Sequence, residues 1–135
     1  MARRKTERRR KALLKAAEQA TRERYSEFGL GLADIAEEIG CSPRQLQRVF
    51  REQANTDFRN FLLRVRMEQA HRLLSRKKRG LSVRRAARAV GYREASGLRQ
   101  RFKGFYGYNP SEIQPEPPDF SELWREKEAR RDGID

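Results

Sequence analysis

The sequence predicts an all-α fold of about seven helices, and three observations support this prediction. Apolar residues recur every three to four positions through most of the 135-residue chain, which is the period of a helix. Residues that favour helix starts precede several of these segments, as Ser42 and Pro43 do. Glycines then end them at Gly40 and Gly91, and the prolines from Pro115 onward bar regular structure. These features predict short helices joined by tight turns.

Each predicted helix follows from a local pattern. The first is expected over residues 6–28, with its apolar side formed by Leu13, Ala16, Ala17, Ala20, Tyr25 and Phe28. A long helix reaching Ser75 is expected to be capped by Thr56 or Asp57, and its length is about 30 Å. The other helices are predicted over residues 34–39, 43–53, 82–90 and 94–105, with a brief one from Pro110 and a tail helix over 119–131.

Two segments of the chain match each other. Residues 32–40 precede a helix with Leu46 and Phe50, and residues 81–91 precede a helix with Leu98 and Phe102. In each copy a small residue lets two helices cross closely, and a glycine permits the turn between them. The second copy has one extra residue in its turn. The match between the two segments predicts two helix-turn-helix motifs, whereas a plain helical hairpin would explain only one such segment.

The charge of the chain indicates a polyanionic partner. The formal net charge is +13, with 32 Lys and Arg against 19 Asp and Glu. Such a balance favours nucleic acid first and an anionic membrane second. The helices lack the wide apolar face of a membrane-surface helix, and no apolar run is long enough to span a bilayer. We therefore expect binding to double-stranded DNA and no binding to membranes.

The same patterns divide the chain into regions. The predicted regions are a basic N-terminal arm (1–11), a first helix-turn-helix subdomain (12–55), a linker helix (56–75), a second helix-turn-helix subdomain (76–114) and a Pro-rich turn with an acidic tail (115–135). The arm is expected to be solvated and partly disordered, and also to lie along DNA phosphates, because such arms often order only on binding. The single cysteine and the lack of a signal-like start predict a cytoplasmic, nucleoid-associated protein.

Several motifs resemble the DNA-binding region of the AraC/XylS family. They run from about Tyr25 to Ile113 and include Leu32-x-x-Ile-Ala-x-x-Ile-Gly, Ser42-Pro-Arg-Gln-Leu-Gln-Arg-Val-Phe-Arg, Arg66-Met-Glu-Gln-Ala-His-Arg-Leu-Leu, Val90-Gly-Tyr and Phe102-Lys-Gly-Phe-Tyr-Gly-Tyr-Asn-Pro. The resemblance implies two three-helix subdomains joined by a long fourth helix. The chain has no room for a small-molecule effector domain, so it is similar to stand-alone, monomeric members that bind an asymmetric site and usually activate transcription.

The resemblance also implies which side chains read bases. In the first recognition helix these are Arg44, Gln47 and Arg48, with Gln45 as a neighbouring candidate. The first three lie on one helical face, and Arg and Gln can form paired hydrogen bonds with guanine and adenine. The alternative to base reading is that these three side chains form an ordinary solvated helix face. The expected site has two halves about 10 bp apart, read in successive major grooves.

The second recognition helix departs from the family pattern. The residues expected to face the groove include Ser96, Arg99 and Gln100, but Gly97 leaves a gap where a larger side chain is usual. This helix is therefore expected to read bases weakly or mainly to contact phosphates. Phosphate contacts, or else plain solvation, are also expected for Arg51, Arg84, Arg85, Arg101 and Lys103.

Other functions have less support in the sequence. An enzyme is not expected, since there is no His, Cys and carboxylate cluster, phosphate loop or nucleophile motif, and no cofactor or metal is implied. The competing function is a non-sequence-specific architectural DNA-binding or RNA-binding protein. We expect Cys41 to be a packing residue rather than a redox sensor, and His71 to have no metal role. Trp124 either docks the acidic tail on the body or belongs to a contact with RNA polymerase.

Overall fold

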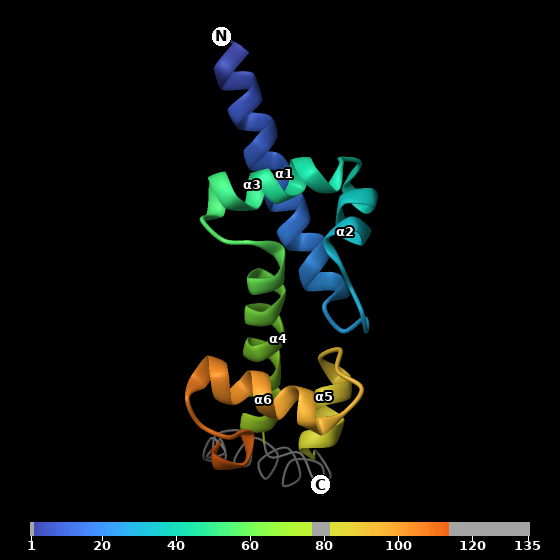
Figure 1. Ribbon diagram of the computed structural model, residues 1–135, viewed down its shortest axis with the longest axis vertical. Helices are drawn as coiled ribbons and strands as arrows, with labels where there is room; N and C mark the ends of the chain where they lie inside the picture. Colours follow the sequence, from blue (N-terminus) through green and yellow to red (C-terminus); the bar gives the residue numbers. More distant parts are fainter. Residues whose placement is uncertain (1, 77–81, 114–135) are drawn as a thin grey trace, which may run out of the picture.

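The computed structural model describes residues 2–76 and 82–113, and these residues form an all-α fold (Figure 1). The described elements are α1 (Ala2–Arg24), α2 (Leu32–Ile39), α3 (Pro43–Ala54), α4 (Phe58–Ser75), α5 (Val83–Ala89), α6 (Ala95–Tyr106) and a 3₁₀ turn, η1 (Pro110–Glu112). The predicted fold class is confirmed. The predicted tail helix, Trp124 and most of the basic segment after Ser75 lie outside the described residues.

The first helix differs from its prediction at both ends. It begins at Ala2 rather than near Thr6, so most of the predicted arm is helical. Lys and Arg are good helix formers, and no glycine or proline interrupts this stretch, which explains the early start. The helix ends at Arg24, whose guanidinium binds Glu27 at 2.6 Å and Glu38 on α2 at 3.0 Å. Phe28 therefore lies in the following turn and is 59% exposed, not on the apolar side of the helix.

The helix starts follow the predicted capping chemistry. The side-chain oxygens of Ser42, Asp57 and Ser82 accept hydrogen bonds from backbone N–H groups three residues later, at 3.1, 2.7 and 3.1 Å. Each bond satisfies one of the N–H groups that a helix start leaves without a partner. Asn55 ends α3 with a φ of 50°. The local sequence thus sets where α3, α4 and α5 begin.

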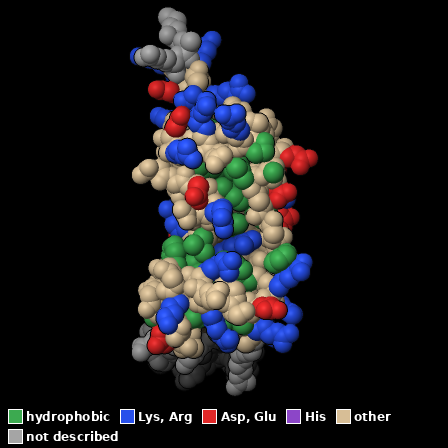
Figure 2. All heavy atoms as spheres, viewed as in Figure 1, with side chains coloured by type: hydrophobic (Ala, Val, Ile, Leu, Met, Phe, Trp, Pro, Cys, Tyr) green, Lys and Arg blue, Asp and Glu red, His purple; other side chains and the backbone are tan. Residues whose placement is uncertain are grey.

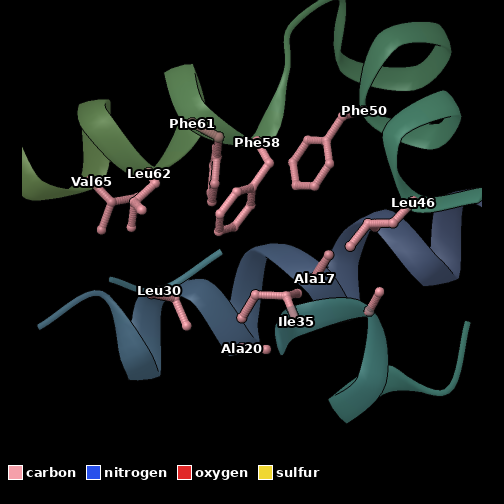
Figure 3. Packing of buried hydrophobic residues seen from close by; sticks show 11 residues of the cluster. Ala17, Ala20, Leu30, Ile35, Leu46, Phe50, Phe58, Phe61, Leu62 and Val65 are labelled. Carbon is pink, nitrogen blue, oxygen red and sulfur yellow. The ribbon is translucent and has the colours of Figure 1, made fainter. Parts of the chain in front are cut away.

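Two separate hydrophobic cores lie at opposite ends of α4. The first joins α1, α2, α3 and the first half of α4, and the tilted rings of Phe50 and Phe61 have centroids 5.8 Å apart (Figure 3). The second joins the second half of α4 to α5 and α6 around Leu98 and Phe102. Because α4 contributes to both cores, it is the structural link between the two helix-turn-helix units.

The two second helices of the motifs, α3 and α6, run across the long axis of the molecule near opposite ends of α4 (Figure 1). The 18 residues of α4 have a length of about 27 Å. One turn of B-DNA is about 34 Å long, which makes this separation compatible with two successive major-groove faces. Among the described helices, none combines the length and apolar character needed to cross a bilayer.

Candidate nucleic-acid interface

The predicted reading face of α3 is exposed and unengaged. Arg44, Gln47, Arg48 and Arg51 line one shallow hollow on the surface of this helix. All four are exposed, while Leu46, Val49 and Phe50 are buried on the opposite side. Within residues 2–76 and 82–113, no hydrogen bond or ion pair involves any of these four polar side chains. Their donors are therefore available to a partner outside the chain.

Gln45 lies on a neighbouring face of α3, beside α1. It is half-buried and lines a second hollow together with Lys5, Arg9 and Arg48. An ion pair of 3.0 Å between Arg10 and Glu52 joins the same two helices, and such an exposed pair contributes at most about 1 kcal/mol. The basic half of α1 thus extends the surface of the first recognition helix, a continuity that sequence reasoning missed.

The predicted residues of α6 are divided between two environments. Arg99, Gln100 and Lys103 are exposed, as is Ser96, whose hydroxyl donates a long hydrogen bond of 3.5 Å to Glu94. Arg101 points elsewhere: its guanidinium donates to the carbonyl of Gly97 at 3.1 Å and lies 5.0 Å from the centroid of the Tyr92 ring. A methyl group at Gly97 would meet only ordinary contacts at 3.6 Å, so a small side chain has room there.

A groove of about 750 Å³ joins the two recognition helices. Gln47 of α3 and Arg101 of α6 both line it, and Arg59 and Arg66 of α4 lie between them. Asp57 is the one acidic residue among its lining residues. The groove places residues of α3 and α6 on one continuous face, whose lining is largely apolar and carries more basic than acidic side chains.

The charge distribution on the surface agrees with this geometry. Figure 2 shows Lys and Arg side chains gathered over the region of α1 and α3 and across the middle of the molecule, with several acidic side chains along the right-hand edge. Arg84 and Arg85 lie apart from the groove, exposed in the first turn of α5. Two residues of the groove, Arg59 and Arg66, were not predicted as site residues. The clue for Arg66 was present, since it stands at an apolar position of the linker helix, four residues after Leu62 and four before Ala70.

Arg66 is a buried charge held by two hydrogen bonds and an aromatic ring. It is 8% exposed, its Nε donates to the carbonyl of Tyr25 at 2.9 Å, and its Nη2 donates to that of Glu27 at 2.8 Å. Its guanidinium lies 5.2 Å from the centroid of the Tyr92 ring. Burial lowers the pKa of Arg66 and raises the pKa of Tyr92, so the tyrosine stays neutral beside the charged guanidinium. Such charge-assisted bonds are stronger than neutral ones and offset the cost of burial.

Two other polar residues have structural surroundings. Cys41 is half-buried against the first core, and burial raises the pKa of its thiol, which disfavours the reactive thiolate. Each ring nitrogen of His71 has a partner at 3.2 Å, the hydroxyl of Tyr108 for Nε2 and that of Ser75 for Nδ1. In the part of the chain that the structure describes, no group of three or more His, Cys, Asp or Glu is placed to hold a metal ion.

The tandem arrangement has a counterpart among known families. A family model described as a helix-turn-helix domain matches residues 35–115, which include both motifs and the linker helix. The chain belongs to the AraC family of helix-turn-helix proteins. It is 30% identical over 94 residues to the Msm operon regulatory protein of Streptococcus mutans, covering 68% of this chain and 33% of that protein. It is 35% identical over 83 residues to the transcriptional regulator GadX of Escherichia coli, covering 62% and 29%. This AraC-family chain thus spans about a third of the length of these relatives.

Solved structures show the same fold. The C-terminal domain of AraT, a response regulator from Geobacillus stearothermophilus, matches with a TM-score of 0.71 and 27% identity, over 76% of this chain and 83% of that one. The DNA-binding domain of AdpA, solved with a target DNA, matches with a TM-score of 0.63 and 27% identity, over 73% and 86%. The two helix-turn-helix units and the linker helix of this AraC-family chain are therefore arranged as in these domains.

Proposed function

We propose that this protein is a sequence-specific regulator of transcription that binds double-stranded DNA as a monomer. One observation carries the proposal: the exposed face of α3 presents Arg44, Gln47 and Arg48 with no partner among the described residues, and Gln47 shares a groove with Arg101 of α6. Two recognition helices that open onto one face can enter successive major grooves on one side of a duplex. The net charge of +13 supplies attraction to phosphates, and AdpA, a relative in fold, was solved with its target DNA.

The proposed site consists of two halves about 10 bp apart. Arg44, Gln47 and Arg48 read the bases of the first half, with Gln45 beside them at the junction with α1. Their free donors support this role, because Arg and Gln can each form two bonds with a purine edge. A single chain carries both recognition helices, so dimerisation is not needed to occupy both halves.

The second half-site is proposed to be read less strictly. Ser96, Arg99 and Gln100 are exposed on α6, but the hydroxyl of Ser96 already has an acceptor in Glu94. Phosphate contacts are proposed for Arg51, Arg84, Arg85, Arg101 and Lys103. The groove adds Arg59 to this set, and the hollow between α1 and α3 adds Lys5 and Arg9. The outcome of binding is proposed to be activation of transcription in the cytoplasm, on the nucleoid. The proposed contact of the acidic tail with RNA polymerase concerns residues beyond those described.

Selection of bound duplexes from a random pool tests this function. We expect an enriched sequence with two halves about one helical turn apart. Enrichment of a single half, or none, would contradict the bipartite mode. A ratio of specific to non-specific affinity near one would instead favour the architectural or RNA-binding alternative.

Alanine substitutions then assign the roles of the two helices. On the selected site, Arg48→Ala should weaken binding about 10- to 100-fold, because it removes paired bonds to one base. On a scrambled duplex the same change should have little effect. Arg99→Ala should reduce both affinities by a similar factor if α6 mainly contacts phosphates. Fluorescence anisotropy with labelled duplexes measures both, and Arg72→Ala, an exposed arginine outside the groove, is the charge-matched control. Equal losses for Arg48→Ala on both duplexes would remove α3 as the main reader.

A further inference from the structure

The two helix-turn-helix units touch each other directly, as well as through the linker helix. The turn after α1 lies against the turn between α5 and α6, with Arg66 of α4 between them. We define the Arg66 bridge as Tyr25, Glu27, Arg66, Gly91 and Tyr92. In it Arg66 binds the carbonyls of Tyr25 and Glu27 at 2.9 and 2.8 Å and lies 5.2 Å from the Tyr92 ring centroid. A further contact beside it, between Arg93 and the Phe28 ring, has a separation of 3.8 Å.

Gly91 shows how closely the two units approach. A Cβ atom at this position would lie 2.8 Å from the carbonyl oxygen of Tyr25 and 2.8 Å from Nη2 of Arg66. Neither neighbour is the loose end of a flexible side chain, because one is backbone and the other belongs to a guanidinium whose Nε and Nη2 each donate a hydrogen bond. Gly40, the corresponding glycine of the first motif, also has a positive φ, but a Cβ there would meet nothing within 4 Å. The close approach is therefore specific to the second motif.

The bridge is connected to both recognition helices. On one side, Tyr25 directly follows α1, and α1 packs against α3 through Ala17 and Ala20, which are buried in the first core. On the other side, the guanidinium of Arg101 on α6 lies 5.0 Å from the Tyr92 ring, which also contacts Arg66. Tyr92 and Arg93 occupy the longer turn of the second motif, so the extra residue there coincides with the contact between the units.

We propose that the Arg66 bridge fixes the angle between α3 and α6 and thereby determines which half-site spacing the protein accepts. A linker helix alone leaves its two attached units free to twist and bend relative to each other. A second, hydrogen-bonded connection removes this freedom. A DNA site with the wrong half-site spacing can then be bound only by breaking or distorting the bridge, and the free energy that this costs lowers the affinity for that site. Arg66 is a positioning residue in this scheme. The inference rests on the proposed bipartite binding.

The first test measures spacing preference. The full chain is titrated with duplexes whose half-sites lie about 9 to 12 bp apart, and with a duplex that has one half-site. The parent should favour one spacing. In Arg66→Met, which keeps much of the buried volume but removes the donors, the ratio between best and worst spacing should fall about tenfold, a change equivalent to one charge-assisted hydrogen bond. Because Arg66 also lines the groove, binding to the single half-site is measured as the reference, and any loss there is divided out before the spacings are compared. An unaltered ratio would overturn the proposal, and so would an equal loss on every duplex.

A matched pair of glycine variants separates positioning from loss of stability. Gly91→Ala and Gly40→Ala both place a methyl group at a positive φ, and both are expected to lower the thermal unfolding temperature. Only Gly91→Ala should also weaken the spacing preference, because only there does the methyl group push the two units apart. If Gly40→Ala weakened the preference as much as Gly91→Ala, the effect would come from stability and the proposal would fail.

A measurement without DNA keeps the inference independent of the proposed function. Spin labels at Glu37→Cys on α2 and Arg88→Cys on α5, both exposed, report the distance between the two units in a Cys41→Ser background. We expect a narrow distance distribution in this parent and a broader or shifted one after Arg66→Met. An identical distribution would overturn the inference even if DNA binding is bipartite. If the parent shows no spacing preference, the proposed bipartite binding is wrong. The spin-label distances then test by themselves whether the Arg66 bridge fixes the two units relative to each other.

Discussion

The affinity of this protein for DNA should fall about 10³-fold or more as the salt concentration rises from about 50 to about 200 mM, given about six or more phosphate contacts. The reason is the release of counterions from each phosphate that a Lys or Arg neutralises. Five exposed residues are the proposed sources of these contacts, namely Arg51, Arg84, Arg85, Arg101 and Lys103, and the groove and α1 add Arg59, Lys5 and Arg9. Anisotropy titrations at several salt concentrations give the slope.

Single neutralising variants calibrate that slope. Lys103→Gln should reduce it by about one unit, as expected for the loss of one phosphate contact, on selected and scrambled duplexes alike. Arg72→Gln, the same kind of change outside the proposed interface, should leave it unaltered. A total loss of less than tenfold over this salt range would contradict a binding mode built on many phosphate contacts.

Phe102→Ala should lower the free energy of unfolding by about 3–5 kcal/mol, a large part of the roughly 5–15 kcal/mol that stabilises a typical domain. Phe102 is 0% exposed at the centre of the second core. Its ring packs on Tyr106 with centroids 4.6 Å apart and meets the Tyr108 ring edge-on at 5.6 Å. Truncation leaves a cavity that these neighbours cannot fill without leaving their positions. Urea unfolding followed by circular dichroism measures the loss.

The same helix supplies a control for this prediction. Phe105 is 41% exposed three residues further along α6, and its main aromatic contact is the edge of Tyr106 at 4.8 Å. Phe105→Ala should cost about 1 kcal/mol or less, since a large part of this side chain already faces water and less apolar surface is lost from the core. Equal losses for the two variants would show that α6 is not anchored through Phe102.

Local chemistry explains which parts of this fold could be predicted from the sequence. The caps at Ser42 and Asp57 depend on hydrogen bonds between residues three apart, so their residue types and order were enough. The buried faces of α3 and α6 follow in the same way from helical spacing. The predicted end of α1 was wrong because Tyr25 and Phe28 continue the apolar spacing of the helix. In the structure the helix ends at Arg24, whose side chain binds Glu27 and Glu38. That competing interaction involves a residue on another helix.

The candidate interface was predictable only in part. The exposed face of α3 followed from the period of the helix, and base reading by Arg44, Gln47 and Arg48 stays a prediction. The apolar position of Arg66 could be read from the sequence, but its partners could not be predicted, because its acceptors precede it by 41 and 39 residues. The same applies to the basic half of α1, whose position beside Gln45 depends on how α1 and α3 cross. Residue type and spacing indicate exposure, but contacts between distant segments depend on the whole fold.

The crossing of α1 with α3 also distinguishes the region that the family model matches from the region that shares one core. The family match begins at residue 35, after α1 has ended. Yet Ala17 is 0% exposed and Ala20 4% exposed, in the same core as Leu46 and Phe50. A chain shortened to residues 35–135 lacks Ala17 and Ala20, so the apolar surface around Leu46 and Phe50 that they cover would be open to water. We expect this shortened chain to aggregate when expressed. Sedimentation of the shortened and full chains measures this difference. We therefore expect the smallest independently folding form of the protein to include its first helix.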